Sequence, residues 1–223
     1  MSHYETSLDA VFSRIEAVRA LTNEHQIIKL VAVSKSVEPH HVEAMYRAGQ
    51  RAFGENKVQE LSRKNVALST LPIEWHFIGR LQKNKINQLI DLNPFLVHSC
   101  DSLALAMELD KRLHVKEKTL PVLLQVNSAK EESKAGVLPE MAVETYLAIQ
   151  ETCPNLQLRG LMSIGAHTED TTIIQDSFET TYRLYESLHK HGAKVCSMGM
   201  SNDFELAVRC GSNMLRLGGV LFS

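Results

Sequence analysis

The chain has 223 residues, of which 44% are hydrophobic and 22% charged, and its formal net charge is −2. This is the composition of a globular domain with a core, and the near-neutral charge argues against general affinity for nucleic acid or an anionic membrane. No apolar run approaches the length of a membrane span. The cysteines are far apart and no signal-peptide pattern opens the chain, so we expect reduced thiols in a cytoplasmic protein.

Apolar periodicity predicts eight strands that alternate with helices. Residues 4–21 carry apolar side chains at helical spacing, which predicts a helix before the first strand. The predicted strands are 30–33, 52–53, 73–78, 95–98, 121–126, 158–164, 194–198 and 214–217. Helix patterns follow every strand except the last, among them 39–49, 103–113, 172–191 and 201–210.

Strands that alternate with helices indicate parallel βαβ units. Eight such units close most naturally into a (β/α)₈ TIM barrel, and an open doubly wound sheet is the alternative. We therefore expect an α/β fold with a single barrel domain over residues 1–223, in which segment 1–24 is an N-terminal helix packed on the barrel.

The first predicted strand leads into Lys35. The sequence there is Leu30-Val31-Ala32-Val33-Ser34-Lys35, and strand alternation predicts that Val31, Val33 and Lys35 share one face. Lys35 would then stand at the carboxyl end of a buried strand, where α/β barrels carry their chemistry. A partly desolvated lysine attacks an aldehyde to form a Schiff base. The alternative is a lysine that simply reaches solvent.

Two glycine-containing turns follow the last two predicted strands. The first is Ser197-Met198-Gly199-Met200-Ser201-Asn202-Asp203, and the second is Leu217-Gly218-Gly219. Backbone N–H groups in such turns bind anions, and barrels often bind phosphate with the loops after strands seven and eight. The alternative is that Ser201 or Asn202 merely caps a helix. The two turns together favour phosphate.

Three further polar residues stand at or near strand ends. Arg216 would bind the phosphate, reach a ligand ring, or pair inside the barrel with an acid such as Glu55. His76 and His98 lack a third ligand at suitable spacing, so we expect hydrogen-bonded barrel residues and no metal site. Pyridoxal 5′-phosphate (PLP) would satisfy both main features of the mouth, because it offers an aldehyde to Lys35 and a phosphate to the loops.

The sequence resembles the PLP homeostasis proteins of the YggS/PROSC type. The matching motifs come in the family's order and span nearly the whole chain. They are Ala32-Val33-Ser34-Lys35, Phe53-Gly54-Glu55-Asn56-Lys57-Val58-Gln59-Glu60, Glu74-Trp75-His76-Phe77-Ile78-Gly79, Leu81-Gln82-x-Asn84-Lys85, Ser133-Lys134-x-Gly136, Arg159-Gly160-Leu161-Met162 and Ser197-Met198-Gly199-Met200-Ser201.

The resemblance implies a PLP barrel of fold type III, like the N-terminal domain of alanine racemase. It implies that Lys35 carries PLP as a Schiff base and that Asn56 and Met162 line the cofactor. Arg216 would face the pyridine nitrogen and keep it unprotonated, which makes the ring a weak electron sink. Such a site suits a carrier or a racemase.

The resemblance also implies that Ser201 and the backbone around Gly218 and Gly219 take the phosphate. The family commonly has a threonine where this chain has Gly219. We expect the missing hydroxyl to weaken phosphate binding by about 1 kcal/mol, the worth of one hydrogen bond. Lys134 is either a secondary PLP or phosphate contact or a solvated loop lysine.

The implied function is PLP binding for intracellular PLP homeostasis, without established catalysis and with effects on amino-acid and keto-acid balance. Its partners would be PLP and, transiently, PLP-dependent apoenzymes, and we expect a monomer. The alternative is an amino-acid racemase, which needs a tyrosine from a C-terminal β-domain that would begin where this chain ends. A third possibility is an aldolase-type enzyme that uses Lys35 on a phosphate-bearing substrate without PLP.

Overall fold

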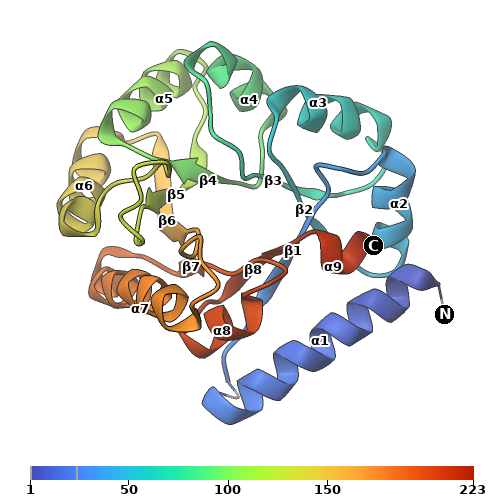
Figure 1. The fold of residues 1–223 in the computed structure, drawn as a ribbon. Helices are drawn as coiled ribbons and strands as arrows, with labels where there is room; N and C mark the ends of the chain where they lie inside the picture. Colours follow the sequence, from blue (N-terminus) through green and yellow to red (C-terminus); the bar gives the residue numbers. More distant parts are fainter. Residues whose placement is uncertain (1, 24) are drawn as a thin grey trace.

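The computed structural model describes residues 2–23 and 25–223, and within them eight parallel strands close into a barrel. The strands pair in chain order, and β8 returns to β1 (Figure 1). Their bounds are β1 Lys29–Val33, β2 Ala52–Glu55, β3 Glu74–Phe77, β4 Leu96–Cys100, β5 Leu120–Val126, β6 Leu156–Ser163, β7 Val195–Ser197 and β8 Met214–Leu217. The predicted (β/α)₈ barrel is confirmed, and the open doubly wound sheet is wrong.

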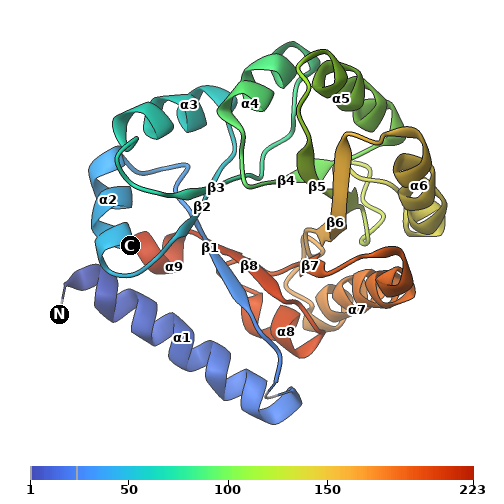
Figure 2. The same ribbon diagram turned by 180° about the vertical axis from the view of Figure 1, so that it is seen from behind.

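Helices surround the barrel on its outer side (Figure 2). They are α1 His3–Thr22, α2 Pro39–Arg47, α3 Val58–Ala67, α4 Ile86–Leu92, α5 Leu103–Val115, α6 Pro139–Thr152, α7 Thr171–Ser187, α8 Phe204–Arg209 and α9 Gly219–Phe222, with 3₁₀ turns η1 Lys83–Lys85 and η2 His189–His191. After β8 the chain forms only the four-residue helix α9, where the sequence showed no helix pattern.

The first helix, α1, packs against the last two helices of the chain. Ser2 and Glu5 form a capping box at its start, and its buried face carries Leu8, Val11 and Ile15 among others. Figure 1 shows α1 lying along α8 and α9, where Arg14 pairs with Glu205 at 3.0 Å. The predicted helical segment 1–24 thus corresponds to α1, while positions 1 and 24 lie outside the described residues.

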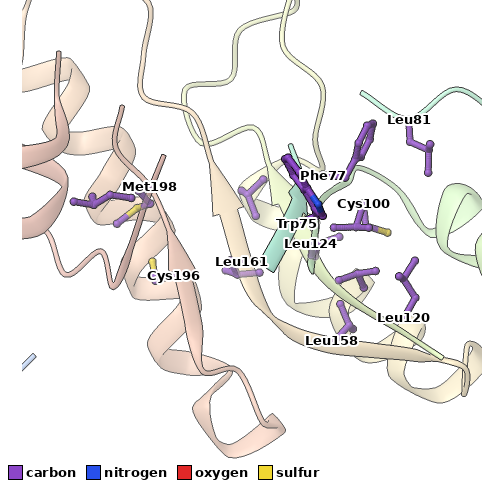
Figure 3. Close-up of a cluster of buried hydrophobic side chains, with 14 of the residues drawn as sticks. Trp75, Phe77, Leu81, Cys100, Leu120, Leu124, Leu158, Leu161, Cys196 and Met198 are labelled. Atoms are coloured by element: carbon purple, nitrogen blue, oxygen red, sulfur yellow. The ribbon is translucent and has the colours of Figure 1, made fainter. Parts of the chain in front are cut away.

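Strand alternation divides the apolar core into two layers. Side chains that point outward pack against the helices, and Figure 3 shows part of this outer layer around Trp75, Phe77 and Leu124. Side chains that point inward fill the barrel itself. This inner layer consists of Val31, Ala52, Leu96, Leu123, Met162 and Met214.

A cavity of about 690 Å³ opens at the end of the barrel where the strands begin. Its walls include Glu74, Leu96 and Met214, which are the first residues of β3, β4 and β8. The parallel strands place this cavity at the opposite end from the loops that follow them. Among the helices described, none is long and apolar enough to cross a membrane.

Candidate functional site

Three neighbouring strands bring Lys35, Asn56 and Gly218 to the same mouth of the barrel. Val33 on β1 pairs with Gly54 on β2, so Lys35 and Asn56 each stand two residues beyond a matched pair. On the other side of β1, Ala32 pairs with Leu217, so Gly218 lies level with Val33. The structure therefore brings these predicted site residues to one end of the barrel.

The lysine itself stands in the turn after β1. The strand ends at Val33, and Lys35 is exposed, so the partial desolvation expected from the sequence is not found. No hydrogen bond or ion pair engages its amine among the described residues. The side chain is free to turn toward a ligand above the mouth.

A buried ion pair holds the backbone immediately before Lys35. The Lys64 ammonium donates to the carbonyl of Ser34 and to the Glu55 carboxylate, both at 2.6 Å. The Ser34 hydroxyl donates to the same Glu55 oxygen at 2.6 Å. Lys64 and Glu55 are 0% exposed, so the pair works in a medium of low dielectric constant. Because Glu55 points outward to α3, the predicted alternative of a Glu55–Arg216 pair is wrong.

Asn56 is held by a close contact between backbones. A Cβ on Gly79 would lie 1.9 Å from the Asn56 carbonyl oxygen, a distance that no side chain tolerates. Glycine at position 79 therefore lets the loop after β3 pack directly against the loop after β2. The Asn56 side chain is half-buried and has no hydrogen-bond partner among the described residues, so its amide is available to a ligand.

Arg216 lies inside the barrel mouth and is 5% exposed. Its Nη1 donates to the carbonyl and the hydroxyl of Ser197 at 2.9 and 2.7 Å, and its Nη2 donates to the carbonyl of Ser163 at 2.8 Å. Burial lowers the pKa of Arg216 to about 10, a shift that the charge of Asp203 partly opposes. The guanidinium is thus fixed to β6 and β7 while it remains a cation at neutral pH.

The two glycine turns meet at Ser201 and Gly218. The N–H of Gly218 donates to the Ser201 hydroxyl at 3.3 Å. In the first turn, the N–H of Met200 donates to Asp203 at 2.6 Å, and burial raises the pKa of that carboxyl. Ser201 lies in a turn before α8, which starts at Phe204, so the predicted helix start at Ser201 is three residues too early.

Met162 lies in the inner layer and is 2% exposed. It pairs in register with Ser197 on β7, which itself pairs with Met214 on β8, so Met162 lies two residues below the level of Arg216 inside the barrel. The structure thus gives Met162 the position of a wall or floor residue below the mouth.

The two barrel histidines are hydrogen-bonded, as the sequence suggested, and their partner is each other. His76 Nδ1 and His98 Nε2 are 2.9 Å apart, and both rings are 0% exposed. Burial lowers the pKa of His76 to about 3 and that of His98 well below its usual value, so both rings are neutral at physiological pH.

Lys134 is not a solvated loop lysine. Its ammonium donates to the carbonyl of Gly165 at 2.6 Å and to Glu131 at 2.9 Å, and its side chain is 16% exposed. These bonds tie the loop after β5 to the segment after β6. They fix the rim of the mouth on the side away from Lys35.

Sequence reasoning missed the residues that hold the site in shape. Ser34 and Lys64 were not assigned to it, yet they hold the turn before Lys35. Ser163 was expected only as a residue at a strand end, and it holds the Arg216 guanidinium. Lys64 was detectable in principle, because it falls on the same helical face as Leu61 and Leu68. The Ser163 contribution comes from its main-chain carbonyl, which no residue type signals.

Comparison with known proteins gives a consistent picture. The chain matches the family model described as "Alanine racemase, N-terminal domain" over residues 6–223. A protein of Helicobacter pylori strain J99 named "Pyridoxal phosphate homeostasis protein" is 53% identical over 222 residues, which cover 100% of this chain and 99% of that protein.

Two solved structures are similar along almost the whole chain. A structure described as an "unknown protein" from Bifidobacterium adolescentis superimposes with a TM-score of 0.93 at 31% identity, covering 99% of this chain and 94% of that one. PipY of Synechococcus elongatus, solved with PLP bound, gives a TM-score of 0.81 at 32% identity over 95% of this chain and 99% of PipY.

Proposed function

This chain belongs to the family of PLP homeostasis proteins, and on that premise we propose that its barrel binds PLP covalently through Lys35. Its role is to hold the cofactor and hand it over inside the cell, which maintains the PLP supply and thereby influences amino-acid and keto-acid balance. The observation that carries the proposal is the single mouth shared by an unpartnered lysine, a fixed guanidinium and two glycine turns.

The residues at the mouth fit the chemical groups of PLP. Lys35 offers an exposed amine to the aldehyde. The Ser201 hydroxyl, which accepts from the Gly218 N–H, and the backbone at Gly219 offer donors to the phosphate. A Cβ on Gly219 would meet no atom within 4 Å, so this loop leaves space for an anion. Arg216 offers a guanidinium to the ring nitrogen, while Asn56 and Met162 line the sides.

Arg216 favours a carrier over a general PLP enzyme. Bound PLP stabilises carbanions when its ring nitrogen is protonated, and an arginine in front of that nitrogen opposes protonation. Burial lowers the pKa of Arg216 only to about 10, so at neutral pH the guanidinium keeps its proton and does not transfer it to the ring. The exposed position of Lys35 also supports release of the cofactor to a protein that approaches from solvent.

The finer assignments follow from the same reasoning. We infer a monomer that contacts PLP-dependent apoenzymes transiently, with no nucleic-acid or membrane partner. The four cysteines are free thiols in the interior, which supports a reducing, cytoplasmic environment.

The test is absorbance of the purified chain during titration with PLP, followed by borohydride reduction and peptide mass mapping. We expect a visible band that moves on reduction and a pyridoxyl mass on the peptide that contains Lys35. The Lys35→Arg variant keeps the positive charge and should give neither, while Lys57→Arg, a nearby exposed control, should behave like the wild type. Absence of any band or adduct in the wild type would exclude the proposal.

A second assay separates a carrier from a racemase. The PLP-loaded chain is incubated with L-alanine and followed by circular dichroism, and separately mixed with an apoenzyme whose activity reports PLP arrival. We expect transfer of the cofactor and no racemisation. Loss of the alanine signal at a catalytic rate would establish the racemase instead.

A further inference from the structure

Four polar side chains form a continuous line across the inside of the barrel. Arg216 on β8 contacts Ser197 on the neighbouring β7, and Ser197 Oγ lies 3.2 Å from His98 Nδ1 on β4. His98 Nε2 lies 2.9 Å from His76 Nδ1 on β3. The Ser197–His98 contact joins strands that are not neighbours in the sheet, so it spans the bore of the barrel. All four residues are buried.

The line has a direction, because arginine can only donate. Arg216 Nη1 donates to Ser197 Oγ at 2.7 Å, which leaves the Ser197 hydroxyl proton to find another acceptor. The nearest acceptor on the line is His98 Nδ1, which must then be unprotonated. A neutral His98 carries its proton on Nε2 and donates it to His76 Nδ1. A neutral His76 then carries its own proton on Nε2.

The reverse arrangement satisfies fewer groups. If His98 Nδ1 carried the proton, Ser197 Oγ would accept from both Arg216 and His98, and its own proton would have no acceptor on the line. His76 Nε2, which has no partner among the described residues, is unsatisfied in either arrangement. The reverse arrangement therefore leaves two buried polar groups without a hydrogen-bond partner, whereas the forward arrangement, which starts from Arg216, leaves one. Each buried group without a partner destabilises the fold.

The forward line fixes the orientation of the guanidinium. Three of its five N–H bonds go to the Ser197 carbonyl, the Ser197 hydroxyl and the Ser163 carbonyl. The other two, on Nε and Nη2, have no acceptor among the described residues. The acceptors that hold Arg216 are all neutral groups, so the line orients the cation without neutralising its charge.

We propose that Ser197 and His98 are positioning residues, which orient Arg216 through this one-directional line so that its remaining N–H bonds serve the ring nitrogen of the cofactor. The inference rests on the proposed function for the ligand. The direction of the line is a property of the protein alone and has its own test.

The first measurement determines the histidine tautomers in the wild-type chain without PLP. Long-range ¹H–¹⁵N correlation spectra distinguish a proton on Nδ1 from one on Nε2. We expect His76 and His98 both to carry the proton on Nε2 at neutral pH. A proton on Nδ1 of His98 would reverse the line and overturn the inference, whether or not the chain binds PLP.

The second measurement compares two ligands in Ser197→Ala. One is PLP, and the other is its carbocyclic analogue, in which a carbon replaces the ring nitrogen. The variant removes the hydroxyl of the line but keeps the main-chain carbonyl that also binds Arg216. We expect PLP to bind roughly fivefold more weakly, the worth of one hydrogen bond, and the analogue to bind as it does to the wild type.

The matched control is Ser177→Ala. Ser177 is a buried serine on α7 whose hydroxyl donates to the Ile174 carbonyl, outside the line. This variant should leave the preference for PLP over the analogue unchanged. Equal weakening of both ligands in Ser197→Ala would mean a purely structural role and would overturn the inference. The wild type is measured before the variants. If it binds neither ligand, the proposed function is overturned instead.

Discussion

Gly219 is a position where a single side chain decides how many donors meet the phosphate. A Cβ there would meet no atom within 4 Å, and its φ is not in the left-handed region, so a larger residue fits without strain. The N–H of the adjacent Gly218 already donates to Ser201, which leaves the loop with few free donors for a phosphate. A hydroxyl at position 219 would supply one.

We therefore predict that Gly219→Thr binds PLP roughly fivefold more tightly, which corresponds to about 1 kcal/mol for one added hydrogen bond. Gly219→Val is the control, because valine has the shape of threonine and the same backbone restriction but no hydroxyl. Absorbance titration measures both affinities. An equal gain in the two variants would assign the effect to backbone rigidity, and no gain in Gly219→Thr would show that the phosphate does not reach this loop.

Individual site residues differ in how far the sequence could specify them. The sequence predicts Lys35 and Arg216 as site residues, because each is a charged residue at or near the end of an apolar strand. The structure brings both to the same mouth. The burial and the hydrogen-bond partners of these two residues could not be predicted from the sequence. Lys35 is exposed because its strand ends two residues earlier, and Arg216 is held by carbonyl groups that every residue possesses. The local sequence pattern predicts where along the chain a charged residue stands, whereas tertiary contacts determine its burial and its hydrogen-bond partners.

At the scale of elements, α3 connects to β1 and β2 through one buried ion pair. Lys64 reaches from α3 to Glu55 at the end of β2 and to the carbonyl of Ser34 just after β1. Its neighbour Arg63 points to solvent and pairs with Glu38 at 2.8 Å and Glu60 at 2.9 Å. Two adjacent residues of one helix thus form ion pairs in opposite environments.

We predict that Lys64→Met destabilises the chain by about 3–5 kcal/mol, because it leaves the Glu55 carboxylate buried without its counter-ion. The double variant Glu55→Gln with Lys64→Met should recover much of that loss, since no unpaired charge remains. Arg63→Ala is the exposed control and should cost much less, because solvent screens exposed ion pairs. Urea unfolding gives all three values. A similar small effect for Lys64→Met and Arg63→Ala would mean that the buried pair contributes little.

The boundaries of the helices and strands show which elements the local sequence pattern can predict and which it cannot. The eighth strand, Met214–Leu217, matches its prediction, because glycine and asparagine delimit its short apolar run. No bounds were predicted for the helix Ile86–Leu92, since the polar residues Lys83–Lys85 form a 3₁₀ turn that leads directly into it. The short helix Gly219–Phe222 was missed because four residues carry no periodicity.

The whole molecule was the most predictable level. Eight repeats of strand and helix leave few arrangements other than a barrel, and closure through the pairing of β8 with β1 agrees with that count. The contents of the barrel were less predictable. Apolar residues fill its middle, but two neutral histidines lie among them, and strand alternation alone does not reveal that they bond to each other across neighbouring strands.

Those two histidines make the stability of the whole barrel depend on pH. Burial lowers both pKa values, that of His76 to about 3, with smaller contributions from the Lys29 charge on His76 and from His76 and then Arg216 on His98. The usual value is 6.5, so the unfolded chain binds protons that the folded chain refuses. The stabilisation is fully present above about pH 6.5 and is lost progressively as the pH falls toward the folded-state pKa values.

We predict that the free energy of unfolding falls by about 1.4 kcal/mol for each of the two histidines between about pH 7.5 and about pH 5.5. Carboxyl groups of ordinary pKa titrate below this range, so the histidines dominate the pH dependence there. His76→Asn removes one titrating group and should reduce the pH dependence by about half, whatever its effect on stability at neutral pH. Urea unfolding of the PLP-free chain at several pH values gives the slopes, and an equal slope in His76→Asn and wild type would mean that His76 already takes up its proton in the folded barrel.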